Sequence, residues 1–152
     1  QQEEARRNKE RKEKVRVYED TGNGYSEDAA YDLPGVVERE ALVKVSLKIN
    51  DDVLAVRIDP ADEPCMVNLI DVVMNGEPLK LDKKTFETHG FGVTGTDSYV
   101  FSTDDPIFSY YLEGMATEVQ DILDLEMEVV RLPKEMAGDL ARSAAKRRFH
   151  LK

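Results

Sequence analysis

The 152-residue chain has 41% hydrophobic and 34% charged side chains, the length and composition of one globular domain that can bury a core. Its single cysteine excludes an internal disulfide, and no apolar run reaches the roughly 18 residues that a membrane-spanning helix needs. The net charge of -10 is concentrated in residues 17–133, where 25 acidic side chains outnumber 8 basic ones, and such an acidic body argues against nucleic-acid binding.

The two ends of the chain differ from this acidic middle. Residues 1–14 contain almost no apolar side chain and many helix formers, which predicts an exposed helix or linker. The chain begins without methionine, and we expect it to be part of a longer protein. Residues 133–152 open with a proline, and the apolar stripe that follows predicts a short helix: Met136, Leu140, Ala141 and Ala144.

Between the ends, short runs of alternating apolar and polar residues predict strands. The clearest run is 41–49, with four apolar side chains on one face and Lys44, Ser46 and Lys48 on the other. The run 66–74 is apolar on both faces, as in a central strand. Further strands are predicted at 15–18, 53–58, 99–101, 107–112 and 125–129.

These strands and the turn signals between them, without alternating helices, predict an all-β protein. We expect an antiparallel β-sandwich of the jelly-roll type over residues 15–132. The dipeptides Asn23–Gly24 and Asn75–Gly76 are signals for tight hairpins. Helix is expected only in the short segments at both ends of the chain.

The residues give no sign of a catalytic apparatus. His89 and His150 have no partner at metal-ligand spacing, and no nucleophile signature accompanies them. Cys65 begins an apolar strand, where a thiol is usually buried and inert. We therefore expect no catalytic residue and no cofactor. The acidic loops leave calcium binding open, although no calcium-loop motif is present.

Three phrases carry a resemblance to a known family: VYEDTGNGYSED (17–28), LAVRIDPADEPCMVNLIDVVMNG (54–76) and VFSTDDPIFSYYL (100–112). In this order and spacing, they resemble the β-sandwich accessory domain found beside glycosyltransferases of bacterial cell-surface polysaccharide synthesis, of the rhamnan, O-antigen and teichoic-acid types. The likeness covers about residues 15–132. The chain departs from the pattern at Val56, where the family has leucine. The resemblance implies a jelly-roll-like domain without catalytic residues, linked by helices to transferase or methyltransferase modules.

The middle phrase contains the polar corner DPADEPC between two predicted strands. Its prolines end strands because they withhold N–H donors, and an aspartate can cap a turn through its side chain. Arg57 stands where it can pair with one of the acids. We expect these residues to define a structural corner rather than a site: Arg57, Asp59, Pro60, Pro64 and Cys65.

Three hypotheses for the function follow. The first is a non-catalytic accessory domain of a multidomain glycosyltransferase in the cytoplasm, carried by its parent protein to the inner face of the membrane. It would space or dock modules and contact glycan weakly. The alternatives are a standalone carbohydrate-binding module and a small sandwich-fold glycan-active enzyme.

A weak glycan contact is expected on the aromatic loop surface of Tyr25, His89 and Tyr99. Exposed aromatic rings offer a stacking face, and Gly90, Gly92 and Gly95 would let a ligand approach the backbone closely. Because the acidic body repels anions, a neutral glycan is the expected ligand.

Overall fold

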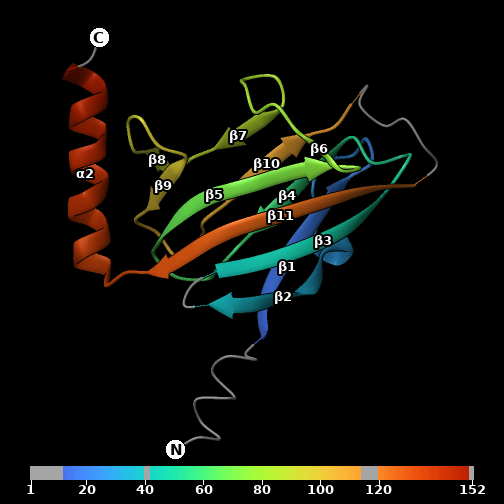
Figure 1. Ribbon diagram of the computed structural model, residues 1–152, viewed down its shortest axis with the longest axis horizontal. Helices are drawn as coiled ribbons and strands as arrows, with labels where there is room; N and C mark the ends of the chain where they lie inside the picture. Colours follow the sequence, from blue (N-terminus) through green and yellow to red (C-terminus); the bar gives the residue numbers. More distant parts are fainter. Residues whose placement is uncertain (1–11, 40–41, 114–119, 151–152) are drawn as a thin grey trace, which may run out of the picture.

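The computed structural model describes residues 12–39, 42–113 and 120–150 of the chain (Figure 1). A 3-10 helix η1 (Glu27–Ala29) follows the first strand, and an α-helix α2 (Lys134–His150) ends the described chain. The strands in these residues are β1 (Lys12–Asp20), β2 (Tyr31–Arg39), β3 (Leu42–Asn50), β4 (Ala55–Asp59), β5 (Cys65–Met74), β6 (Glu77–Pro78), β7 (Phe86–Thr88), β8 (Phe91–Gly92), β9 (Ser98–Phe101), β10 (Phe108–Tyr111) and β11 (Gln120–Arg131).

The strands form two antiparallel layers that share one core. Hydrogen bonds connect them in the order β7-β10-β4-β1-β2-β3-β11-β5-β9-β8, with β6 beside β5. The register of β2 with β3 shifts between Val37 and Arg39, an irregularity of the kind that bends a sheet. In Figure 1, β4 and β10 lie behind β5 and β11, and apolar residues of all four strands belong to one buried cluster. The prediction of an all-β sandwich is therefore confirmed at this level.

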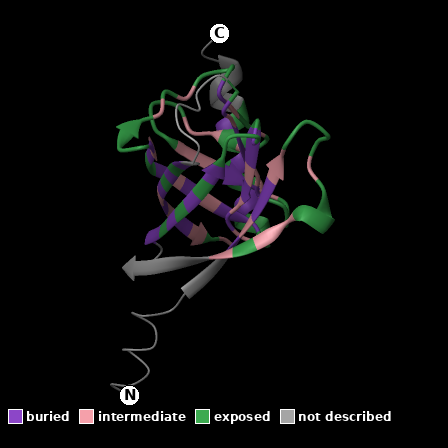
Figure 2. Cartoon of the chain, turned by 90° about the vertical axis from the view of Figure 1, so that its right-hand side faces the viewer, coloured by how far each residue is buried: buried purple, intermediate pink, exposed green. Residues whose placement is uncertain are grey.

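Alternating side chains explain why these segments fill the core. In β3, the apolar positions from Val43 to Ile49 are buried, and Lys44, Ser46 and Lys48 are exposed. Figure 2 shows this pattern in the burial colours along the strands. The prediction of a central strand at 66–74 is confirmed, because β5 pairs with β11 on one side and β9 on the other.

Aromatic rings pack between the strands at the two ends of the strand order, β7 and β10 at one end and β9 at the other. Phe108 in β10 lies 5.2 Å from Phe101 in β9, measured between ring centroids, and meets it edge to face. Phe86 in β7 contacts the rings of Tyr99 and Tyr110 in the same cluster. Edge-to-face and tilted pairs add to the free energy gained by burying the rings. The end strands are thus held near one another by side chains.

The chain itself also joins these two ends. Only His89 and Gly90 separate β7, at one end of the strand order, from β8, at the other. At Gly90 an added Cβ would lie 2.8 Å from the ring of Phe101. The backbone therefore passes so close to a core ring that a side chain does not fit there.

Helix α2 covers the outer side of β8 and β9. Strand pairing sets four apolar residues in one row across β11, β5, β9 and β8: Val130, Met66, Val100 and Phe91. The helix packs on β8 and β9, and its buried positions are the small residues Ala137, Ala141 and Ala144. Small side chains let the helix lie close to the sheet, which explains why Val100 is buried although it points away from the main core.

Some predicted elements differ from the structure. Lys12–Lys14 belong to β1 instead of a helix or linker, and residues 1–11 of that predicted segment lie outside the described residues. The tight hairpin predicted at Asn23–Gly24 is wrong, because a longer connection joins β1 to β2. The Asn75–Gly76 hairpin is confirmed: both residues have positive φ and link Met74 to its partner Glu77. Strand β2 was not predicted, since its proline and glycine are unfavourable in strands.

The close approach at Gly90 makes a testable prediction. The substitution Gly90→Ala should lower the free energy of unfolding by about 1–3 kcal/mol, because the new methyl group overlaps the Phe101 ring. Chemical denaturation measures this difference. Gly92→Ala is the matched control: its Cβ would lie 3.7 Å from Tyr99, an ordinary contact, and should change stability by no more than about 0.5 kcal/mol. Equal effects of the two substitutions would contradict the steric explanation.

Candidate functional site

A row of polar side chains crosses the outer face of four strands. Strand pairing places Tyr18 of β1 opposite Arg57 of β4, Arg57 opposite Ser109 of β10, and Ser109 opposite Glu87 of β7. These residues alternate with Val17, Val56, Phe108 and other core residues, so they lie on the face turned away from the core. We call Tyr18, Arg57, Ser109 and Glu87 the floor.

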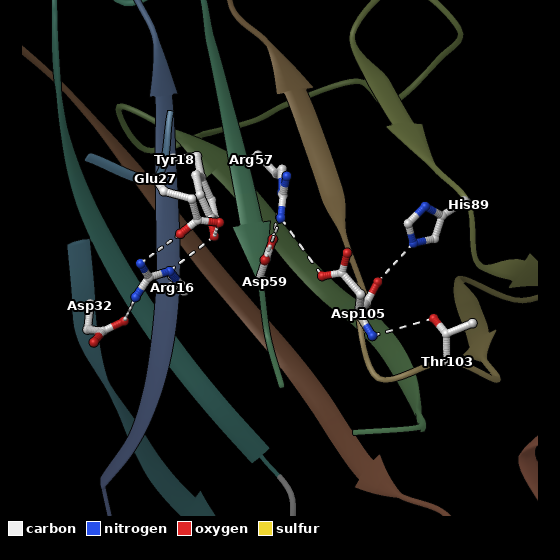
Figure 3. A network of polar contacts seen from close by, with 9 residues as sticks. All are labelled: Arg16, Tyr18, Glu27, Asp32, Arg57, Asp59, His89, Thr103 and Asp105. Atoms are coloured by element: carbon white, nitrogen blue, oxygen red, sulfur yellow. Dashed lines mark hydrogen bonds and ion pairs between the residues drawn. The ribbon is translucent and has the colours of Figure 1, made fainter. Parts of the chain in front are cut away.

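Arg57 of the floor contacts three other side chains (Figure 3). Its Nε and Nη2 donate hydrogen bonds to the two carboxylate oxygens of Asp59, at 2.9 and 2.8 Å. Its guanidinium lies 4.1 Å from the ring centroid of Tyr18, a cation–π contact, and 3.8 Å from the Asp105 carboxylate. The hydrogen bond with Asp59 is the main cause that raises the pKa of Arg57. The guanidinium is therefore fixed in position and its charge is balanced.

A second group of polar contacts lies beside the first and holds η1. Arg16 donates to the hydroxyl of Tyr18 at 3.1 Å and to the Glu27 carboxylate at 3.1 Å. The Tyr18 hydroxyl donates to the other oxygen of Glu27 at 2.9 Å, as Figure 3 shows. These hydrogen bonds, first from Tyr18 and then from Arg16, lower the pKa of Glu27. Asp32 completes the group at 3.5 Å from Arg16.

Residues 21–30 connect β1 to β2 and contact the floor where Glu27 accepts the hydrogen bond of Tyr18; we call them the cover segment. The Asp20 carboxylate accepts hydrogen bonds from the backbone N–H groups of Gly22 and Gly24, at 2.8 and 2.9 Å. The Tyr25 side chain reaches the floor: burial raises its pKa, and the neighbouring Ser109 hydroxyl acts in the opposite direction. The Tyr25 hydroxyl itself is buried.

The far end of the floor is formed by Glu87 and Tyr111. The Tyr111 hydroxyl donates a hydrogen bond to the Glu87 carboxylate, and this bond raises the pKa of Tyr111 to about 12. Tyr110, the preceding residue, is buried in the core. The two adjacent tyrosines thus point to opposite faces of β10, as the alternation of strand side chains requires.

The three residues predicted to form a glycan surface occupy different environments. His89 is exposed, and its Nε2 lies 2.9 Å from the backbone oxygen of Asp105, next to the Arg57 group. Tyr25 lies over the floor. The Tyr99 ring packs between the layers, with centroids 5.7 Å from Phe86 and 5.6 Å from Phe108. Tyr25 and His89 are thus both neighbours of the Arg57 group, whereas Tyr99 contributes its ring to the core.

The residues predicted to form a corner lie between β4 and β5. Arg57 pairs with Asp59, one of the corner acids, as expected. Pro60, Pro64 and Cys65 are buried, and the Pro64 carbonyl accepts a hydrogen bond from the Leu132 N–H at 3.0 Å. The predicted burial of the Cys65 thiol is confirmed, and this burial raises its pKa to about 12.

Sequence reasoning identified Arg57 but missed the other three residues of the floor. Tyr18, Ser109 and Glu87 come from three strands that are far apart in the sequence. The available signal was a polar residue inside an apolar run, as Ser109 is between Phe108 and Tyr110. That signal marks an outward position in a strand, but only strand pairing shows which outward positions are neighbours.

The chemistry that this face offers is hydrogen bonding and ring contact. Among the residues that the structure describes, no group of three or more His, Cys, Asp or Glu side chains is arranged to hold a metal ion. None of the helices in the described ranges has the length and apolar content needed to cross a membrane.

Comparisons with protein-family models, with curated proteins and with solved structures find no match to this chain. The class that its structure defines is an all-β sandwich with a C-terminal helix.

The Arg57–Asp59 pair makes the second prediction. Asp59→Ala should lower the free energy of unfolding by about 2 kcal/mol, because two charge-assisted hydrogen bonds to a partly buried guanidinium are lost. Thermal and chemical denaturation measure the change. Asp32→Ala is the control: Asp32 is an exposed partner of Arg16 at 3.5 Å, so its loss should cost less than about 0.5 kcal/mol. If Asp59→Ala is as mild as Asp32→Ala, the pair does not hold the corner.

Cys65 makes the third prediction, which concerns pH. Burial raises the pKa of the folded thiol to about 12, whereas the pKa of an unfolded cysteine is about 8.5. Its contribution to stability is therefore complete below about pH 8.5 and is lost as the pH rises towards 12, with a slope of at most about 1.4 kcal/mol per pH unit. Urea unfolding at pH 8, 9 and 10 should show this decline. In Cys65→Ala the curve should be flatter over that range, and identical slopes would show that the thiol does not titrate differently on unfolding.

Proposed function

We propose that this chain is a non-catalytic accessory domain of a multidomain glycosyltransferase of cell-surface polysaccharide synthesis. In this role it spaces and docks the transferase or methyltransferase modules of the same protein, in the cytoplasm and, through its parent, at the inner face of the membrane. The resemblance of its three sequence phrases leads to this assignment, and to the jelly-roll type within the sandwich class. A non-catalytic domain has no need of a cofactor.

The observation that supports this proposal is that reactive side chains bind other parts of the fold. Arg57 and Asp59 are joined by two hydrogen bonds, and the His89 ring is held at the Asp105 carbonyl. The Cys65 thiol is buried with a raised pKa, which makes it a poor nucleophile. These groups serve the geometry of the domain, as a scaffold or docking module requires.

Helix α2 offers the surface for docking. Its buried positions, Ala137, Ala141 and Ala144, face the sheet. Met136 and Leu140, one helical turn apart, remain 51% and 39% exposed. Two large apolar side chains on one stripe of an exposed helix suit contact with a neighbouring module of the same chain.

The second candidate is a standalone carbohydrate-binding module. The polar floor favours it, because hydroxyl and carboxylate groups gather there on a face turned away from the core. A small glycan-active enzyme is the third candidate. It would have to show turnover of a nucleotide sugar or a glycoside by this chain alone.

The fourth prediction tests docking in the full-length parent. The double substitution Met136→Lys and Leu140→Lys should separate the domain from its neighbour, because it places two charges in an apolar contact. Hydrogen exchange and small-angle scattering measure the separation. The isolated domain should keep its melting temperature within a few degrees, because both side chains are exposed.

Glu135→Lys is the control, since it changes the charge of α2 at an exposed polar position. The control should leave the parent compact. A parent that stays compact with both lysines contradicts docking through α2. Nucleotide-sugar turnover by the isolated chain would contradict the non-catalytic assignment.

A further inference from the structure

A fully buried carboxylate lies near the start of β11. Asp121, the second residue of this strand, is 0% exposed. Its Oδ1 accepts a hydrogen bond from Nδ2 of Asn75 at 2.7 Å. Within the residues that the structure describes, no hydrogen bond reaches its Oδ2. A buried carboxylate is costly unless hydrogen bonds replace its contacts with water, so Asp121 depends on the amide of Asn75.

Asn75 connects the hairpin between β5 and β6 to β11. Its backbone N–H donates to the carbonyl of Ile122 at 2.8 Å, and the N–H of Ile122 donates to the side-chain Oδ1 of Asn75 at 2.8 Å. Together with the bond to Asp121, both polar atoms of the side-chain amide therefore have a partner on β11. The amide acts as donor and acceptor at once, which an ionised carboxylate in its place could not do.

The glycine that follows makes this amide chemically labile. In an asparagine–glycine pair, the backbone nitrogen of the glycine can attack the side-chain Cγ of the asparagine, because no Cβ hinders the approach. The new C–N bond closes a succinimide ring, and the side-chain nitrogen takes up the glycine N–H proton and leaves as ammonia. Water then adds to either ring carbonyl and gives aspartate or isoaspartate. In the pair Asn75–Gly76, the leaving nitrogen is the atom that binds Asp121.

The hairpin itself is the part of this contact that can open. Strand β6 consists of Glu77 and Pro78, and both residues are exposed. These two residues pair with Val73 and Met74 of β5, and Pro78 has no N–H to donate. Short, exposed elements open locally more often than core strands do. A local opening at the hairpin can therefore release the amide of Asn75 while the core strands stay in place.

We propose that Asn75 is a site of spontaneous deamidation, and that this modification separates the hairpin from β11 irreversibly. The new carboxylate would face Asp121 from the position in which Nδ2 now donates its hydrogen bond. Two negative charges would then meet at a buried group, which is strongly unfavourable. A hairpin that has opened and reacted cannot close in its former position. The pair thus converts brief local openings of the domain into a lasting change of its structure.

The fifth prediction concerns variants of the full chain that imitate the product. At about pH 7.5, Asn75→Asp should lower the melting temperature by about 10 °C, because it sets a second carboxylate against a buried one. Asn75→Gly should be milder, since glycine keeps the positive φ of the turn and adds no charge. Combining Asn75→Asp with Asp121→Asn should recover most of the loss, because one amide again faces one carboxylate. Asn23→Asp is the matched control: it adds the same charge before a glycine at an exposed position, and should shift the melting temperature by no more than about 2 °C.

Mass spectrometry of peptides from the incubated chain follows the reaction itself. Asn75 should react about tenfold more slowly in the folded chain than in urea, because only opened hairpins react. Equal rates in the two conditions would overturn the inference, as would the absence of any product at Asn75 after several weeks of incubation of the folded chain. So would an Asn75→Asp variant that is as stable as Asn75→Gly. If Asn75→Asp does not fold, the rates in the unmodified chain and the stability of the double variant decide.

Discussion

The contact between Phe101 and Phe108 connects strands β9 and β10, which lie near opposite ends of the strand order. Their ring centroids are 5.2 Å apart, and they meet edge to face. Together with their neighbours Phe86 and Tyr99, these rings belong to the one core that the two layers share. Because large rings bury much apolar area, their packing stabilises the folded-over arrangement. The short passage through His89 and Gly90 then joins the two end strands, and at Gly90 an added Cβ would overlap the Phe101 ring.

The positions of helix α2 and of the floor follow from this arrangement. Folding the strands into two layers gives each layer an outer face, and the two outer faces differ in polarity. On β8 and β9 the outer face is apolar, and the alanines of α2 cover it. On β1, β4, β10 and β7 the outer face carries the polar floor, in which Tyr18 and Ser109 are buried and Glu87 is exposed. Helix α2 on the first face presents Met136 and Leu140 to the outside, which suits docking.

Arg57 belongs both to the corner between β4 and β5 and to the floor. Its hydrogen bonds with Asp59 fix the corner between β4 and β5, and its guanidinium lies over the ring of Tyr18. Through Asp105 it is also close to the loop that binds His89. The same residue therefore stabilises the corner and sets the charge of the floor. The corner residue Arg57 is thus also a member of the floor.

The sequence by itself determined the all-β class, the central position of the 66–74 strand, the Asn75–Gly76 hairpin and the buried state of Cys65. These features depend on local alternation, on backbone preferences and on burial of apolar runs. Each of these signals comes from residues that are close together in the sequence. It could not show strand β2, because Pro34 and Gly35 disfavour a strand locally and pairing with β1 and β3 overrides that preference. Nor could it bring Tyr18, Arg57, Ser109 and Glu87 into one row, or place Tyr99 inside and Tyr25 over the floor. Strand order and register decide which outward side chains become neighbours, and these are set by contacts between residues distant in the chain.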